Sequence, residues 1–258
     1  WTGSAWDEAA FSVTGAVTSF NTRTGAVTLS LADVNGVYTS SDATINGLTV
    51  GKGANALASN TALGVSALSS GSLSGTNNTA VGFQAGLAIT TASGVTAIGY
   101  QSLANLTTGL QNTAVGTLAL GFNTTGTGNA GFGRAAGYSN TTGNSNTAIG
   151  IDALFYNTTS AHTAVGYQAL YNNTTGTENN AFGMGALYSN TTGGFNTALG
   201  RQALRANTTA NNNTAVGYQA LFTNTASNNV AVGYQALYTN TTGTNNASLG
   251  HKANFSGN

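Results

Sequence analysis

Few side chains in the repetitive part of this 258-residue sequence could do acid–base chemistry. After residue 55 the acids are Asp152 and Glu178, and the histidines are His162 and His251. General acid–base catalysis needs such groups to converge on one bond, and glycoside cleavage needs a pair of carboxylates. No carboxylate pair recurs in neighbouring repeats, and Asp152 and His162 are interpreted as an accidental exposed pair. The sequence therefore predicts a protein that is not an enzyme, unless chains combine to assemble a carboxylate site.

Metals and cofactors are not expected either. The chain has no Cys, which excludes thiolate metal sites, Cys nucleophiles and disulfides. It also lacks the G-G-x-G-x-D repeats with which some solenoids bind calcium. We predict no catalytic, cofactor-binding or metal-binding residues.

The composition excludes further classes of protein. Charged residues make up 5% of the chain, with 6 Lys+Arg against 6 Asp+Glu, whereas soluble domains average about 25%. A neutral chain without a basic run is not expected to bind nucleic acid. No apolar stretch approaches the roughly 18 residues of a membrane span, so membrane insertion is not expected. No signal peptide is recognised, and Trp1 in place of Met indicates a fragment or a processed chain.

A repeat of about 17 residues organises the chain after residue 55. The octet TAVGYQAL occurs at Thr163–Leu170 and again at Thr214–Leu221, and ten variants of it surround these copies. We number positions from the central glycine of each octet. The predicted turn glycines include Gly82, Gly99, Gly116, Gly150, Gly166, Gly200 and Gly217.

Comparison of the twelve repeats assigns a role to each position. Position −1 is always apolar and position +4 is usually Leu, so both are predicted to form the core, whereas the variable position +1 is predicted to face solvent. Positions −2 and +3 are small and are expected to let backbones approach closely. The predicted core includes Val81, Ile98, Val115, Ile149, Val165, Val216, Leu103, Leu120, Leu154, Leu170, Leu204 and Leu221.

The period predicts an all-β fold. Seventeen residues are too few for the helix pairs of α-solenoids but suffice for two short strands and two turns. The strands are expected at x-T-A-V-G and Y-Q-A-L-Y, and N-T-T-G has the chemistry of a turn. We predict a parallel β-solenoid or β-roll of about twelve coils over residues 55–258. Residues 1–18 are expected to end a small β module, and residues 19–54 to form a short β-rich connector.

A coil of this size encloses little volume. Its small-residue stripes therefore suggest a second burial surface against other chains. A parallel homotrimer is the simplest closed arrangement, so the first expected partner of the chain is itself.

Several segments resemble known fibrous proteins. The T-A-V/I-G-x-x-A-L unit resembles the N-S-V-A-I-G-type repeat of trimeric autotransporter adhesin heads, which form left-handed parallel β-roll trimers with shorter repeats. The longer unit TAVGYQALYNNTTGTENN, Thr163–Asn180, is more similar to repeats of bacteriophage tail fibres. Trp1–Phe11 looks like the end of a β module, Ser19–Val34 resembles a tail-fibre connector, and Ile45–Gly53 resembles the strand leading into a repetitive shaft.

The resemblance implies a phage tail-fibre segment that lies in the virion, outside the cell, and takes part in host attachment. The implied partners are a host cell-surface glycan or outer-membrane component, and other tail or baseplate proteins bound through a missing N-terminal part. The alternatives are a bacterial trimeric surface adhesin head and, from another class, an ice-binding β-solenoid. A purely structural spacer is equally compatible with the sequence.

Three recurrent surface features bear on these alternatives. The Asn-x-Thr/Ser sites read as turns closed by the Asn side chain rather than as glycan acceptors. The Thr pairs, from Thr107/Thr108 to Thr241/Thr242, could form the flat rows that ice-binding solenoids display. Exposed aromatic rings can stack on sugars, so the candidate receptor contacts are the tyrosines at position +1, namely Tyr100, Tyr167, Tyr218 and Tyr234. The aromatic residues at +5 are expected to pack over the Leu corner or into a seam between chains.

Overall fold

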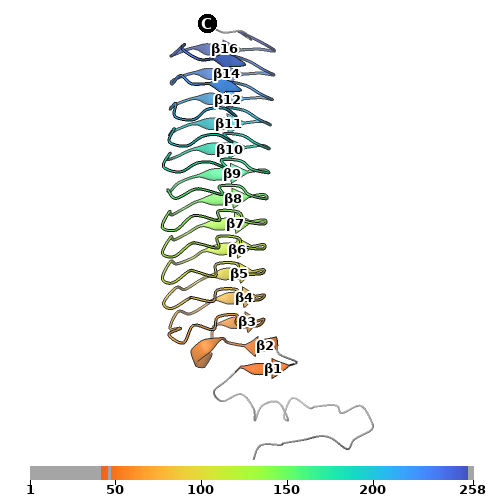
Figure 1. Cartoon of the computed structure of the whole chain (residues 1–258), viewed down its shortest axis with the longest axis vertical. Helices are drawn as coiled ribbons and strands as arrows, with labels where there is room; N and C mark the ends of the chain where they lie inside the picture. The colour runs from red at the N-terminus through yellow and green to blue at the C-terminus, as the bar shows by residue number, and fades with distance from the viewer. Residues whose placement is uncertain (1–41, 46–47, 255–258) are drawn as a thin grey trace, which may run out of the picture. The chain divides into compact units, whose positions relative to one another are not determined.

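The computed structural model of the chain describes residues 42–45 and 48–254. These residues form an all-β parallel solenoid of about eleven turns, each about 17 residues long (Figure 1). The predicted fold class is therefore confirmed. The predicted β module of residues 1–18 and the connector as far as residue 41 lie outside the described residues.

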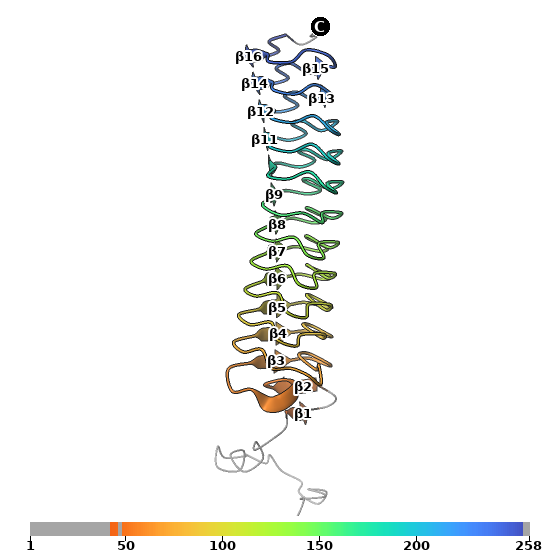
Figure 2. The same cartoon turned by 90° about the vertical axis from the view of Figure 1, so that its left-hand side faces the viewer.

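Each repeat contributes one three-residue strand on its T-A-V segment, and these strands stack in parallel and in register (Figures 1 and 2). Two antiparallel strands, β1 (Ala43–Ile45) and β2 (Leu48–Gly51), precede the stack, and the short 3₁₀ helix η1 (Ala54–Ala56) follows them. The parallel strands are β3 (Thr61–Leu63), β4 (Thr79–Val81), β5 (Thr96–Ile98), β6 (Thr113–Val115), β7 (Ala130–Phe132), β8 (Thr147–Ile149), β9 (Thr163–Val165), β10 (Asn180–Phe182), β11 (Thr197–Leu199), β12 (Thr214–Val216), β14 (Val230–Val232) and β16 (Ala247–Leu249).

The strand residues whose side chains face the interior of the solenoid are not those that were predicted to do so. Side chains alternate along a strand, and here the alanine at −2 is buried while the residues at −3 and −1 point outward. The side chains between the sheet and the buried leucines are all small: alanine in ten repeats, with Gly131 and Ser248 in the other two. The assignment of position −1 to the core was wrong: Ile98 and Ile149 are exposed, and Val81, Val115, Val165 and Val216 are only half-buried.

Leucines at +4 fill the inside of each coil. Leu103, Leu120, Leu154, Leu170, Leu204 and Leu221 are all buried, which confirms this half of the predicted core. The alanines at −2 and +3 pack with them inside the same chain. The small-residue stripes are therefore not a surface for other chains, contrary to the prediction.

The predicted second strand, Y-Q-A-L-Y, is a run of turns. Gln168 at +2 and Leu170 at +4 have φ of 53° and 51°, in the left-handed region, and the same conformation recurs along the stack. Their amides still bond to neighbouring coils, because Gln168 N donates to Ile151 O at 3.0 Å and Leu170 N donates to Ala186 O at 3.0 Å. In the described part of the chain, only β13 (Thr223–Asn224) and β15 (Thr239–Asn240) pair on this side of the coil.

The central glycines are required by the approach of successive coils. Gly166 has φ of 131°, and a Cβ there would lie 2.7 Å from the carbonyl carbon of Gly183 in the next coil. Only glycine tolerates both conditions. The same geometry recurs at the other predicted turn glycines, Gly82, Gly99, Gly116, Gly150, Gly200 and Gly217.

Two stacks of buried asparagines close the corners of the coils. Asn123, from N-T-T-G, accepts the Gly126 amide at Oδ1 (2.9 Å) and donates from Nδ2 to the Gly126 carbonyl (3.1 Å). At position −4, Asn129 donates to Gly143 O at 2.8 Å and accepts the amide of Asn146 at 3.0 Å. The interpretation of the sequons as closed turns is therefore confirmed for the buried set Asn123, Asn140, Asn157, Asn173, Asn190, Asn207 and Asn240.

Candidate functional site

The outer face of the parallel sheet carries a continuous apolar row, which we call the outer stripe. It consists of the residues at −1, and the register of the sheet places each of them beside its counterpart in the next coil. Ile149 is 41% exposed, Leu199 48% and Leu249, in the last described coil, 80%, and the valines of the row are half-buried. The stripe comprises Leu63, Val81, Ile98, Val115, Phe132, Ile149, Val165, Phe182, Leu199, Val216, Val232 and Leu249.

The residues at +1 form a second outward row beside the outer stripe. Tyr100, Tyr167 and Tyr234 are exposed and Tyr218 is half-buried. The structure thus places all four predicted receptor contacts in one row on one face.

The rings of this row stack on one another along the solenoid. Tyr218 and Tyr234 have ring centroids 5.3 Å apart and nearly parallel planes, and Tyr234 stacks on His251 at 5.0 Å. The guanidinium of Arg201 lies 5.8 Å from the other face of Tyr218. Both faces of Tyr218 and Tyr234 are therefore covered, and only ring edges and hydroxyls remain for a ligand. Tyr100 has one face against Phe83, at 5.5 Å.

A longer aromatic row lies at position +5, and we call it the aromatic ladder. Its members are half-buried and stack with centroids 5.0 to 5.3 Å apart, except where Arg205 lies between the rings of Tyr188 and Phe222. The +5 rings thus pack on their own neighbours within the chain. The ladder comprises Tyr138, Phe155, Tyr171, Tyr188, Arg205, Phe222 and Tyr238.

The aromatic ladder ends at a hollow. The two preceding repeats have Gly121 and Ala104 at +5, and a cavity of about 270 Å³ opens there. Phe122, Leu118, Gln101 and Asn105 also line it, as do Leu87 and Tyr138. Sequence reasoning missed this hollow, although the change from aromatic residues to Gly and Ala at one position of the repeat was a usable signal.

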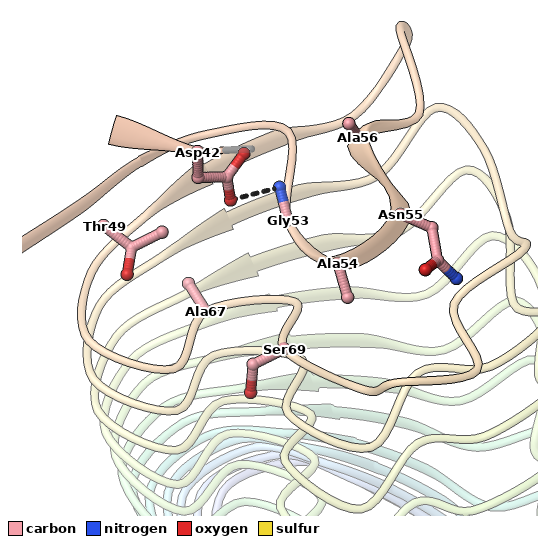
Figure 3. A pocket seen from close by; sticks show the side chains of 8 residues that line it. All are labelled: Asp42, Thr49, Gly53, Ala54, Asn55, Ala56, Ala67 and Ser69. Atoms are coloured by element: carbon pink, nitrogen blue, oxygen red, sulfur yellow. Dashed lines mark hydrogen bonds between the residues drawn. The ribbon is translucent and has the colours of Figure 1, made fainter. Parts of the chain in front are cut away.

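A second cavity, also of about 270 Å³, lies beside β2 and η1 at the start of the stack (Figure 3). The carboxylate of Asp42 accepts the Lys52 amide at 2.6 Å and the Gly53 amide at 2.8 Å. The rest of the cavity is lined by Thr49, Gly53, Asn55 and Ser69 together with the methyl groups of Ala54, Ala56 and Ala67. The carboxylate holds the chain entering the first coil, and none of the other described residues that line the cavity is ionisable.

Asp152 and His162 are not the exposed pair that the sequence suggested, because both are buried. The Asp152 carboxylate binds the guanidinium of Arg134 at 2.7 Å. His162 takes the place of an asparagine in the −4 stack, and burial lowers the pKa of its imidazole from 6.5 to about 4. Within residues 42–45 and 48–254, no three His, Cys, Asp or Glu residues gather as a metal site would require.

The threonine corners use part of their hydroxyls within the chain. In several coils the first hydroxyl of the pair donates to a carbonyl of the next coil, as from Thr107 to Thr124 O at 3.0 Å and from Thr174 to Thr191 O at 3.0 Å. The second threonine, such as Thr175 or Thr192, is exposed. One row thus stabilises the stack and the other faces solvent at a corner rather than on a flat sheet.

Comparison of the chain with protein-family models, with curated proteins and with solved structures finds no match. Among the residues that the structure describes, no helix is long and apolar enough to cross a membrane.

Proposed function

We propose that this chain is a non-catalytic segment of a bacteriophage tail fibre, which self-associates as a parallel homotrimer, extends the fibre and presents a host-attachment surface. It would act in the virion, outside the host cell. The outer stripe is the observation that carries this proposal.

The outer stripe suits a second and a third copy of the same chain. Soluble monomers rarely expose contiguous apolar patches larger than a few hundred Å², and such patches mark interaction surfaces. Here the patch follows the whole parallel sheet and repeats at every coil, so it matches a partner with the same period. Another copy has that period by definition, and three-fold packing lets each copy cover its neighbours.

The absence of charged residues from the outer stripe supports the same arrangement. None of the residues in the outer stripe is charged, so burial of the stripe leaves no ion unpaired. Arg134, beside the stripe at +1, is already paired with Asp152 within its own chain.

Assignment to a phage fibre rests on the resemblance of the repeat and on the order of the connector-like segments Ser19–Val34 and Ile45–Gly53. Three-fold symmetry presents each contact residue three times. Weak contacts to a host glycan or outer-membrane component then add up through avidity. Other tail or baseplate proteins would hold the fibre at its other end.

Light scattering coupled to gel filtration tests the proposal. We expect a species of three times 25.6 kDa for the wild-type chain. The double variant Ile149→Glu, Phe182→Glu places charges on the outer stripe and should reduce this mass to that of a monomer. The control Thr175→Glu adds a charge at an exposed corner away from the stripe and should stay trimeric. A wild-type monomer with the far-ultraviolet signal of a folded β protein contradicts the proposal.

A further inference from the structure

We propose that the hollow at Gly121 and Ala104 binds a single neutral pyranose ring of a host-surface glycan. The inference rests on the proposed attachment function and deepens it, because it gives the contact a place and a ligand class.

The repeat itself shows what fits the hollow. Two coils further on, at the position equivalent to Gly121, the ring of Phe155 stacks on Tyr171 at 5.2 Å. Its edge meets Tyr156, the +6 residue of the same coil, at 4.7 Å and 77°. Tyr156 in turn meets Tyr171 at 5.3 Å and 83°. A six-membered ring is thus enclosed between one aromatic face and one aromatic flank.

At the hollow the same enclosure exists without its ring. Phe122 is the +6 residue, and it meets Tyr138 at 4.9 Å and 79°, as Tyr156 meets Tyr171. Gly121 supplies no side chain, and a Cβ placed there would already lie 3.4 Å from Cδ2 and Cε2 of the Tyr138 ring. Phe155 covers the other face of Tyr138, at 5.0 Å. The side of the Tyr138 ring opposite Phe155 therefore borders the hollow, with Phe122 as its flank.

The polar groups around the hollow favour a sugar over an aromatic ring. Gln101 donates to Gln84 Oε1 at 2.7 Å, but Leu118 replaces the glutamine of the next coil. Among the described residues, no donor from the coil of Leu118 then reaches the side-chain oxygen, Oε1, of Gln101. Asn105 donates to Gly121 O at 2.6 Å, which leaves its own Oδ1 as an acceptor. Side-chain carbonyls beside an aromatic face suit the hydroxyl groups and the apolar face of a pyranose.

The lining also limits the charge of the ligand. No Asp, Glu, His, Lys or Arg is among the described residues that line the hollow. A carboxylated sugar would find no cation to pair with its charge. We therefore expect neutral hexopyranosides, not sialic or uronic acids.

The test is saturation-transfer NMR on the full chain with methyl glucopyranoside, methyl galactopyranoside, methyl mannopyranoside and N-acetylneuraminic acid as probes. At least one neutral probe should receive saturation, and the acidic probe should receive none. The variant Gly121→Phe extends the aromatic ladder into the hollow as Phe155 does further on, and we expect it to weaken binding at least tenfold. Phe195→Ala, which removes an exposed ring in a distant coil outside the lining of the hollow, should bind like the wild type.

Absence of saturation from every neutral probe overturns the inference, as does equal binding by Gly121→Phe. If Gly121→Phe fails to fold, Phe122→Ala removes only an exposed flank, and we expect at least fivefold weaker binding; unchanged binding overturns the proposal. The mass of the wild-type chain separates the two proposals. A monomer that binds a pyranoside contradicts the trimeric fibre and supports the sugar subsite. A trimer that binds no pyranoside supports the trimeric fibre and contradicts the subsite.

Discussion

His162 stands where ten of the twelve repeats have Asn, so His162→Asn restores the regular stack. Its imidazole lies among uncharged groups: the Asn179 amide donates to Nδ1 at 3.2 Å, and Nε2 lies 2.9 Å from Thr159 Oγ1. Because Nδ1 accepts a hydrogen bond, the neutral ring carries its proton on Nε2 and donates it to the Thr159 hydroxyl. A second proton on Nδ1 would face the Asn179 N–H, donor against donor, in a buried site.

The free-energy consequence follows from the pKa. Burial lowers the His162 pKa to about 4, against 6.5 for the unfolded chain. Below pH 6.5 the unfolded chain takes up a proton that the native chain refuses, so the free energy of unfolding falls as the pH falls and levels off below about pH 4. A difference of about 2.5 in pKa corresponds to about 3.4 kcal/mol in full, and to about 2.4 kcal/mol between pH 7 and pH 4.5.

The assay is denaturant-induced unfolding of the wild type and of His162→Asn at pH 7 and pH 4.5, at one protein concentration. All other titrating groups are shared, so the difference between the two pH dependences isolates His162. The variant should fold, because Asn229 holds the same position in the other sixteen-residue step of the stack and donates to Ala226 O at 3.1 Å. We expect the wild type to lose about 2.4 kcal/mol more than the variant on acidification. Equal losses would refute the reasoning.

Three further predictions concern the regular coils. Gly166→Ala should lower the free energy of unfolding by ~3 kcal/mol or more, because its Cβ would collide with the next coil. Gly71→Ala, where a Cβ meets nothing within 4 Å, should change it by less than ~0.5 kcal/mol; similar losses at both sites would contradict the stacking geometry. Asn173→Ala should cost ~2 kcal/mol by chemical denaturation, because it removes the buried bonds from Asn190 Nδ2 to Asn173 Oδ1 and from Asn173 Nδ2 to Asn157 Oδ1, both at 2.9 Å. Asn180→Ala should lower the free energy of unfolding little, since another repeat has alanine at that position. Equal losses in Asn173→Ala and Asn180→Ala would mean that the buried asparagine stack adds no stability of its own. The wild-type chain should produce no thermal hysteresis in freezing-point measurements, because its exposed threonines lie at corners; a measurable hysteresis would favour ice binding.

Much of the fold follows from comparison of the repeats within this one sequence. The period, the central glycines, the leucines at +4 and the asparagine corners were all predictable, because each is nearly invariant and each has one physical reason. The direction in which the strand faces was not, because Thr-Ala-Val alternates whichever residue points inward, and the larger apolar residue is the natural choice for a core. The thickness of the coil decides for alanine, and that thickness is a property of the whole turn.

The turns that follow the central glycine of each repeat were also not predicted from the sequence. Gln168 and Leu170 adopt left-handed conformations that neither residue type favours, and the register of the coils holds them there. Gly185 at +2 and Gly137 at +4 have the same positive φ, so occasional glycines at these positions were the available signal. For the site, the sequence placed the +1 tyrosines on one face but could not predict that their rings would cover one another.

The two proposed activities draw on opposite properties of the stack. Where successive coils repeat the same residue, polar and aromatic side chains commonly pair with their copies one coil away, as in the Gln219 and Gln235 pair at 2.8 Å. Such rows offer a ligand only edges, but an apolar row that points outward, as at −1, gains nothing from its copies and stays available to another chain. Free bonding capacity for a small ligand arises where the repeat changes: Gly121 removes a ring, and Leu118 ends a chain of glutamines, in the same coil. Regular positions thus favour self-association, and a local break in the repeat favours a ligand site, so a search for receptor contacts should begin at the breaks.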